Sequence, residues 1–252
     1  MIVYCDGSSF PDGPADLFYA RVCCLWETYR STGLAEFWIQ RTKGRTAAWL
    51  CRLEQTLSVA VAESADKDEL LDFISFLGAP SLFCPPGLKP RGYEMALEGE
   101  VLRCLKSFGG VPLCDMPVEV EGNPSGGRLY ALLSQCQSNT LILPDRDGFL
   151  SDYARRIRLG TGRAKLLRFN GQDAAVAITT AETPGLSVLG GLAVLPQQRE
   201  KGLATAVLAR LTRELLGEGK QVFLATSGSD LVQFYTARDF SPCGGWRLDR
   251  RE

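Results

Sequence analysis

The chain has 252 residues, with 28 Lys and Arg against 29 Asp and Glu, and 45% of its residues are hydrophobic. This length allows one large domain or two small ones, each with a buried core. The chain contains no histidine, which excludes mechanisms that need an imidazole, including Ser-His-Asp and Cys-His catalysis and His-bearing metal sites. The net charge of −1 gives no reason to expect a polyanionic partner, so we expect no nucleic-acid binding.

Cysteine usage and hydropathy predict the cellular setting. Nine cysteines are scattered along the chain without a C-x-x-C pair, which predicts reduced thiols and no metal site. The N-terminal segment lacks the basic region of a secretory signal, and no stretch reaches the roughly 18 apolar residues of a membrane span. We therefore expect a cytoplasmic protein that is neither secreted nor inserted in a membrane.

The first half of the chain alternates helical and extended patterns. Helical spacing of apolar residues, period-2 alternation and breakers predict a strand at 2–5, a helix at 15–29, strands at 37–41 and within 47–62, a helix at 65–77 and a strand at 81–84. Ser64 is the expected N-cap of the second helix. This alternation predicts an α/β layer.

A dense run of glycine and proline between Ser107 and Gly127 predicts a linker, because these residues break both helices and strands. We place a domain boundary near residue 116, which gives domains 1–116 and 117–252. The first has 11 basic and 15 acidic residues, and the second has 17 and 14. The mildly positive second domain should therefore carry any anionic ligand.

The second half repeats the order of the first. The patterns predict helices at 129–135 and 148–159, strands at 164–169, 174–181 and 186–194, a helix at 201–216, a strand at 222–226, a helix at 230–238 and a strand at 246–249. We interpret the two halves as diverged copies of one unit, on the order of their elements alone.

A strand that runs into a helix through a basic loop stands out in the second half. The strand ends at Val194, and Gly202 opens an amphipathic helix. The first N–H groups of such a helix lack intrahelical partners and the helix dipole favours an anion there, so we expect a phosphate or pyrophosphate ligand. Gly202 allows close approach, the small Ala204 avoids a clash, and Arg199 adds charge-assisted hydrogen bonds. The G-x-x-x-x-G-K-[ST] and G-x-G-x-x-G fingerprints are absent, so these residues do not select one phosphate ligand.

The spacing of this region resembles a known signature. The pattern V-x-P-x-x-R-x-x-G-x-A is similar to the acetyl-CoA motif of the GNAT superfamily of N-acetyltransferases, and its positions here are Val194, Pro196, Arg199, Gly202 and Ala204. The later segment F-Y-T-A-R-D-F, at 234–240, resembles the family's L-Y-x-x-x-G-F, with Asp239 where glycine is usual. The resemblance covers about residues 125–252 and reaches the first half only through element order.

The resemblance implies a role for each matching position. The strand residues Leu192, Ala193 and Val194 would pair through their backbone with the pantetheine arm. The pyrophosphate would lie against Arg199, Glu200, Lys201, Gly202, Leu203, Ala204 and Thr205. Tyr235 matches the tyrosine that protonates the departing CoA thiolate. From the residues themselves, Gly190-Gly191 predicts a bulge or splay that exposes backbone N–H groups to an oxyanion.

Several of these residues have a plain structural interpretation as well. Arg199 also fits a solvated surface charge. Tyr235 shares a helix face with Leu231 and Phe234, which is also the pattern of a packed core tyrosine. Glu182 has the chemistry of a general base, but an exposed turn carboxylate is the interpretation we favour, so no base is assigned. Cys243 is a candidate reactive thiol near the end of the chain.

The expected fold is α/β, with a GNAT-like mixed and mostly antiparallel sheet flanked by helices, in two similar domains in tandem. The expected activity is acetyl transfer from acetyl-CoA, by direct attack, to a primary amine of a small molecule or peptide, without a metal. The N-terminal domain should lack a cofactor site, because the stretch at 59–69 has no glycine and carries four carboxylates. The alternatives are a non-catalytic acyl-CoA-binding or regulatory module, and a nucleotide-binding protein that uses the same loop.

Overall fold

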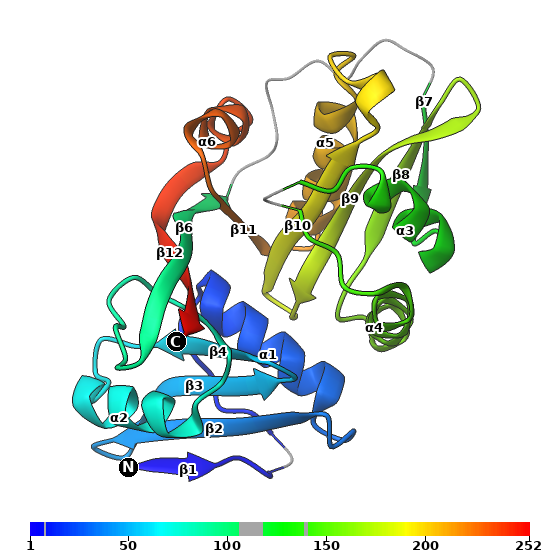
Figure 1. Cartoon of the computed structure of the whole chain (residues 1–252). Coiled ribbons are helices and arrows are strands. Elements are labelled where there is room, and N and C mark those ends of the chain that lie inside the picture. Colours follow the sequence, from blue (N-terminus) through cyan, green and yellow to red (C-terminus); the bar gives the residue numbers. More distant parts are fainter. Residues whose placement is uncertain (8, 106–117, 139–140) are drawn as a thin grey trace. The chain divides into compact units, whose positions relative to one another are not determined.

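The computed structural model describes residues 1–7, 9–105, 118–138 and 141–252 (Figure 1). They form two compact units. Unit 1 comprises Met1–Val101 and Cys243–Glu252, and unit 2 comprises Leu102–Pro242. The predicted boundary near residue 116 lies outside the described residues. Unit 1 includes Cys243–Glu252, which the predicted domains 1–116 and 117–252 assigned to the second domain.

Unit 1 is a mostly antiparallel sheet with two helices. Its helices are α1 (Leu17–Tyr29) and α2 (Lys67–Leu77). Its strands are β1 (Ile2–Tyr4), β2 (Ala35–Thr42), β3 (Arg45–Leu53), β4 (Thr56–Val61), β5 (Ser81–Cys84), and the larger parts of β6 (Tyr93–Cys104) and β12 (Ser241–Arg251). The strand order is β1-β2-β3-β4-β5-β12-β6. β4 and β5 run parallel, and α2 forms the crossover that connects them.

Helix α2 begins later than the sequence predicts. Its N-cap is Asp66, whose carboxylate accepts the Glu69 N–H at 3.1 Å, so the predicted cap Ser64 lies outside the helix. Aspartate is a strong N-cap and its negative charge suits the helix dipole, which explains the shift. Gly78 ends the helix in the left-handed conformation, with φ of 60°. Leu70 and Ile74 then pack into the core of unit 1.

Unit 2 also has a mixed sheet. Its strands are β7 (Val118–Gly122), β8 (Ala164–Phe169), β9 (Gln172–Glu182), β10 (Leu186–Val194) and β11 (Gln221–Thr226), and its helices are α3 (Gly126–Ser134), α4 (Arg146–Leu159), α5 (Leu203–Gly217) and α6 (Ser229–Thr236), with a 3-10 turn η1 (Pro196–Gln198). The strand order is β11-β10-β9-β8-β7, and β10 and β11 run parallel while the other neighbours run antiparallel. The mixed, mostly antiparallel sheet that the sequence predicts is confirmed.

Two strands were not predicted. β7 falls inside the expected glycine- and proline-rich linker, where Val118 and Val120 pack against the core while Glu119 and Glu121 are exposed. β6 falls in a segment where the sequence analysis predicted no element, and most of its first eight residues are exposed. The linker interpretation is therefore wrong for 118–122, because pairing with β8 overrides the local glycine and proline signal.

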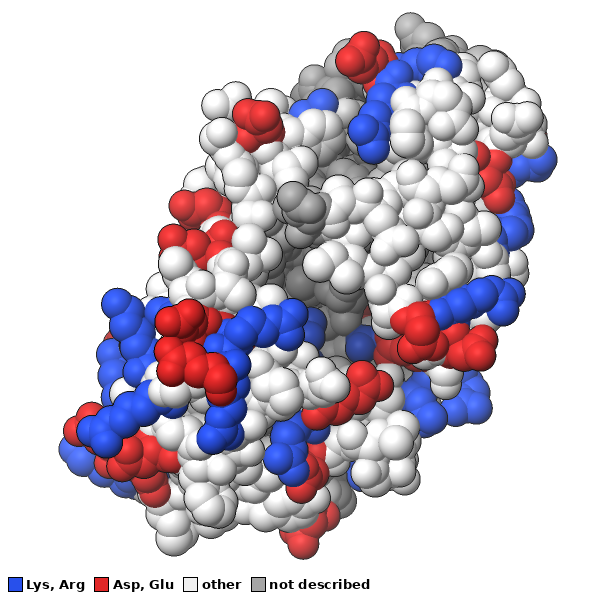
Figure 2. All heavy atoms as spheres, in the orientation of Figure 1, with Lys and Arg blue, Asp and Glu red and all other residues white. Residues whose placement is uncertain are grey.

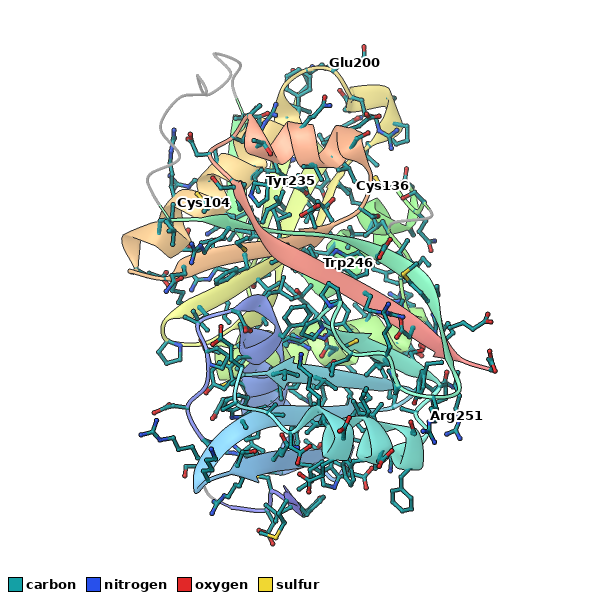
Figure 3. The ribbon with its side chains drawn as sticks, turned by 90° about the vertical axis from the view of Figure 1, so that its left-hand side faces the viewer. Cys104, Cys136, Glu200, Tyr235, Trp246 and Arg251 are labelled. Atoms are coloured by element: carbon teal, nitrogen blue, oxygen red, sulfur yellow. The ribbon has the colours of Figure 1, made fainter. Side chains whose placement is uncertain are left out.

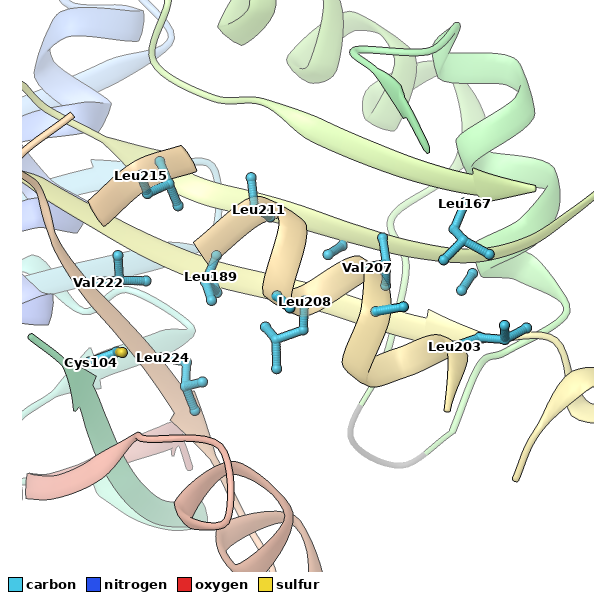
Figure 4. Close-up of a cluster of buried hydrophobic side chains, with 14 of the residues drawn as sticks. Cys104, Leu167, Leu189, Leu203, Val207, Leu208, Leu211, Leu215, Val222 and Leu224 are labelled. Carbon is cyan, nitrogen blue, oxygen red and sulfur yellow. The ribbon is translucent and has the colours of Figure 1, made fainter. Parts of the chain in front are cut away.

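Helices cover both faces of the unit 2 sheet. Successive residues of β8 point to opposite faces, so Leu167 packs under α5 and Leu166 packs under α3. Figure 4 shows the apolar face of α5 against the strands, where Leu203, Val207, Leu208, Leu211 and Leu215 are each at most 1% exposed. This packing fixes the N-terminus of α5 relative to the end of β10, where the candidate site lies.

Candidate functional site

A fork opens between β10 and β11. The two strands pair from Leu186 with Gln221 to Leu189 with Leu224, and the described register ends there. β10 continues to Val194 beside β9 with a register shift between Gly190 and Ala193. The β11-facing edge of Gly190–Val194 therefore has no paired strand within the described residues. The bulge that the sequence predicts at Gly190-Gly191 is confirmed, and we call this opening the fork.

The two glycines are required by the local backbone. Gly191 has φ of 68°, in the left-handed region that side chains other than glycine rarely adopt. A Cβ on Gly190 would lie 2.5 Å from Cγ2 of Thr180 on the neighbouring strand. Both observations explain why the irregularity of β10 occurs here.

The helix that follows the fork begins without a side-chain cap. The N-cap of α5 is Gly202, with φ of 75° and no capping side chain, and the first turn contains no acidic residue. Helix α5 starts at Leu203 and not at the predicted Lys201, because Gly202 is left-handed. Glu200 also has a positive φ of 62°. The first-turn N–H groups of α5 therefore have no capping side chain, and such groups at a helix start favour an anion.

The side chains around this helix start divide into two groups. Arg199, Glu200 and Lys201 are exposed, and Lys201 Nζ donates a hydrogen bond to Gln198 Oε1 at 2.8 Å. Arg199 Nε lies 3.4 Å from the Val194 carbonyl oxygen. Leu203 and Thr205 are buried and Ala204 is half-buried, so the helix start offers mainly backbone groups.

The predicted strand residues also offer backbone rather than side chains. Ala193 is buried in the core cluster under α3, and Leu192 and Val194 pack partly against the cluster under α5. Their side chains are thus used for packing, while the strand edge at the fork remains available for hydrogen bonds. Such an edge can pair with an extended group that carries hydrogen-bond donors and acceptors along its length.

Tyr235 lies on α6, and two residues separate the end of β11 from the start of this helix. Figure 3 shows it on the side of α6 that faces the strands of unit 2. Its ring contacts Phe234 and Phe240 edge-on, at centroid distances of 5.2 and 5.8 Å. Burial raises the pKa of Tyr235 to about 12. The ring is therefore packed as in a core tyrosine, while the hydroxyl stays protonated at neutral pH and has no hydrogen-bond partner among the described residues.

Asp239 stands where the resembled motif has glycine, and its backbone adopts a conformation that glycine favours. Asp239 has φ of 63°, and the turn that ends α6 is closed by hydrogen bonds from the Arg238 and Phe240 N–H groups to the Tyr235 carbonyl oxygen, at 2.9 and 3.3 Å. Aspartate tolerates the left-handed region better than most residues. The departure from the family pattern therefore leaves the end of this helix intact.

We expect Asp239→Gly to keep turnover and to change stability by less than about 1 kcal/mol, because glycine adopts this φ freely. Asp239→Val should destabilise by about 1–2 kcal/mol, because a β-branched residue is strongly disfavoured there. Chemical denaturation of the two variants measures the difference. Equal stability of both variants would contradict a requirement for the left-handed turn.

Glu182 does not fit the role of a general base. It is 2% exposed, and its carboxylate pairs with Arg163 and Lys220, each at 2.7 Å, and accepts the Thr179 hydroxyl at 2.8 Å. It lies opposite Ser187 near the start of β10, whereas the fork opens after Leu189. The expectation of an exposed turn carboxylate is also wrong, because the two cations draw Glu182 into a buried ion-pair network.

Two further expectations concern thiols and metals. Cys243 is exposed and donates a hydrogen bond to the Val101 carbonyl oxygen at 3.4 Å, and both residues belong to unit 1. The Arg199–Thr205 segment belongs to unit 2. Within the described ranges, no group of three or more His, Cys, Asp or Glu side chains is arranged to hold a metal ion. None of the described helices has the length and apolar character needed to span a membrane.

The corresponding helix start in unit 1 is filled by the chain itself. Asp66 caps α2, and Glu69 accepts hydrogen bonds from the Met1 ammonium at 2.8 Å and from Gln40 Nε2 at 2.9 Å. The described β4–β5 register ends at Ser58, and there Arg21 Nε donates to Ser58 Oγ at 2.9 Å while its guanidinium lies 5.2 Å from the Phe83 ring centroid. The start of α2 is thus capped by a carboxylate, whereas the start of α5 has no side-chain cap.

Comparisons with known proteins support the fold described above. Residues 168–233 match the model of a family described as FR47-like protein. A putative acetyltransferase of the GNAT family from Novosphingobium aromaticivorans is 18% identical with a TM-score of 0.57, over 94% of this chain and 100% of that one. A GCN5-related N-acetyltransferase from Sphaerobacter thermophilus is 16% identical with a TM-score of 0.60, over 86% and 80%. A tandem GNAT protein from the clavulanic acid biosynthesis pathway is 14% identical with a TM-score of 0.54, over 85% and 82%. No curated protein matches the chain in sequence.

Proposed function

We propose that this chain, whose fold and FR47-like match support its assignment to the GNAT superfamily, transfers an acetyl group from acetyl-CoA to a primary amine. The shared fold supports acyl transfer in general. The observation that carries the finer proposal is the fork beside the uncapped start of α5. Unit 2 has both features, and the corresponding places in unit 1 are occupied by its own side chains.

The fork fits the arm of a pantetheine thioester. The arm is extended and contains two amides, so it can form hydrogen bonds with the free edge of Leu192, Ala193 and Val194 as a short strand would. The pyrophosphate would then lie at the Arg199–Thr205 segment, where N–H groups and the helix dipole favour negative charge. The exposed Arg199 and Lys201 would add charge-assisted hydrogen bonds.

The proposed reaction is a direct transfer. The nitrogen of a neutral amine attacks the thioester carbonyl carbon, and a backbone N–H at the bulge stabilises the oxyanion. The C–S bond then breaks, Tyr235 donates its proton to the thiolate, and the amide nitrogen loses its extra proton to water. Tyr235 is later reprotonated from solvent. No covalent enzyme intermediate is required.

Charge and cysteine usage support a cytoplasmic role without a nucleic-acid or membrane partner, which we include in the proposal. Figure 2 shows Lys and Arg side chains interspersed with Asp and Glu on the face in view, and a polyanion usually selects a continuous basic surface. The acceptor in this proposal is the amine of a small molecule or peptide.

An acetyl-CoA consumption screen over polyamines, aminoglycosides, amino acids and peptide N-termini tests this function. Turnover with one amine class would support the transferase. Tight CoA binding without turnover on any amine would favour the non-catalytic acyl-CoA-binding module. Binding of ATP without binding of CoA would favour the nucleotide-binding alternative.

Gly202→Asp should weaken acetyl-CoA binding by about 2 kcal/mol or more, because the new carboxylate repels the pyrophosphate beside the helix start. The side chain itself has room, since none of the described residues beyond the chain neighbours has an atom within 4 Å of a Cβ at this position. Gly202→Asn is the matched control, because it has the same positive φ and similar size without the charge. Calorimetry that finds equal affinity for the Asp and Asn variants would contradict a pyrophosphate at this position.

A further inference from the structure

Arg238 follows α6 and is fixed beside the first turn of α5. Its Nε donates a hydrogen bond to Thr205 Oγ1 at 2.8 Å, and Thr205 is the third residue of α5. Its Nη1 donates to the Phe234 carbonyl oxygen at 2.6 Å, and its guanidinium carbon lies 3.7 Å from the centroid of the Phe234 ring. Three contacts therefore hold this cation at one place, next to the start of the helix.

This is an unfavourable place for a cation. The N-terminus of a helix carries a partial positive charge, and the first turn of α5 contains no acidic residue that would offset it. Arg238 is partly buried, and this burial lowers the pKa of its guanidinium. The positive charges of Arg238 and of the helix start thus add to one another.

Arg238 has no counter-ion among the residues that the structure describes. In the described part of the chain, no carboxylate lies within ion-pair distance of it. Two other arginines of unit 2 form ion pairs with carboxylates. Arg163 contacts Glu182, Glu214 and Glu218 at 2.5–2.9 Å, and Arg128 contacts Glu121 and Asp173, both at 2.6 Å. A partly buried guanidinium at a positive helix end, without a carboxylate, points to an anion that comes from outside the chain.

We propose that Arg238 binds a phosphate group of the ligand at the start of α5 and, through Phe234, positions the helix that carries Tyr235. This proposal deepens the proposed function and rests on it for the identity of the ligand. Nη2 of Arg238 makes no hydrogen bond within the described residues, so it is available to donate to a phosphate oxygen. Neither the signature motif nor the Tyr235 segment singled out this residue.

The same side chain links the phosphate end of the site to the proton donor. Arg238 holds Phe234 by a hydrogen bond and by stacking, and Phe234 directly precedes Tyr235. A phosphate that draws on the remaining guanidinium donors would keep this stack in one geometry. Arg238 is thus a ligand-binding residue toward the phosphate and a positioning residue toward Tyr235.

The test compares Arg238→Gln and Arg238→Lys with the wild type, using CoA, pyrophosphate and pantetheine as probes in calorimetry or competition. Arg210→Gln is the matched control, because Arg210 is exposed on α5 outside the site. We expect Arg238→Gln to weaken CoA and pyrophosphate about 10- to 100-fold and to leave pantetheine within about twofold, since one charged hydrogen bond is lost. Arg238→Lys should recover part of the loss, and Arg210→Gln should behave as wild type.

Two outcomes would overturn the inference. Unchanged CoA and pyrophosphate affinity in Arg238→Gln would show that no phosphate contacts Arg238. An equal loss for CoA and pantetheine, with a lower melting temperature, would show that the residue only supports the fold. The inference and the proposed function fail separately. A wild type that binds pyrophosphate or ADP in an Arg238-dependent manner, but not CoA, would retain the anion site and exclude the acetyltransferase.

Discussion

Tyr235→Phe should lower turnover by about 10²–10⁴ while acetyl-CoA affinity changes little. The substitution keeps the ring and its contacts with Phe234 and Phe240, and it removes only the hydroxyl. Burial raises the pKa of Tyr235 to about 12, so the phenol holds its proton throughout the neutral range and is present in its donor form when the C–S bond breaks. Steady-state kcat and KM for acetyl-CoA, with the amine found in the screen, measure the effect.

The raised pKa of Tyr235 also predicts how kcat depends on pH in the alkaline range. The donor form of Tyr235 is lost only as the pH rises through about 12, so Tyr235 should cause no alkaline decline in kcat below about pH 10. A decline centred nearer pH 9 would mean that another group limits the rate or that Tyr235 is less buried in solution.

Tyr153→Phe is the matched control. Tyr153 is also a partly buried tyrosine of unit 2 with a pKa raised to about 12, but its hydroxyl donates to the Pro124 carbonyl oxygen at 2.9 Å. Loss of the Tyr153 hydroxyl should cost about 1 kcal/mol of stability and leave turnover unchanged.

Near-full turnover in Tyr235→Phe would contradict the proton-donor role and assign protonation of the thiolate to solvent. A lower melting temperature of Tyr235→Phe with full turnover would show that the Tyr235 hydroxyl supports the fold and not the reaction.

The elements that the sequence predicted well are defined by local signals. The bounds of β5, β8 and β10 agree with the prediction, because each is a short, mainly apolar segment that is followed within two residues by proline or glycine. β6 was not predicted, because most of its first eight residues are exposed and it carries Glu94, Glu98 and Glu100. Its formation depends on pairing with strands far along the chain. β12 was predicted only in part, at 246–249, because two glycines precede Trp246.

The same distinction applies to the site. The fork and the helix start followed from Gly190-Gly191 and Gly202, since a glycine with positive φ marks an irregular backbone within a few residues. Arg238 and Glu182 could not be assigned from the sequence. Arg238 contacts Thr205 across 33 positions of the chain, and Glu182 is buried by cations 19 and 38 positions away. Only the folded structure brings these side chains and their partners together.

A chain that ends at Pro242 should lose the folded structure of unit 1 and keep that of unit 2. The deleted part of β12 pairs with β5, from Arg247 opposite Cys84 to Arg250 opposite Ser81. Trp246 is 7% exposed and its ring lies 5.8 Å from that of Phe83, so its removal alone should cost about 3–5 kcal/mol. Loss of the strand would also expose the backbone edge of β5. Together these effects approach the whole stability of a small domain.

Limited proteolysis with and without CoA measures this effect, because all the residues proposed to bind CoA belong to unit 2. We expect rapid cleavage within residues 1–101, and a fragment of unit 2 that still binds CoA. The matched control ends at Arg250, which keeps every residue paired with β5 and removes only Arg251 and Glu252. This control should resist protease nearly as the full chain does. Protection of residues 1–101 in the chain ending at Pro242 would contradict a structural role of β12, and loss of CoA binding by the unit 2 fragment would show that unit 2 needs the C-terminal strand as well.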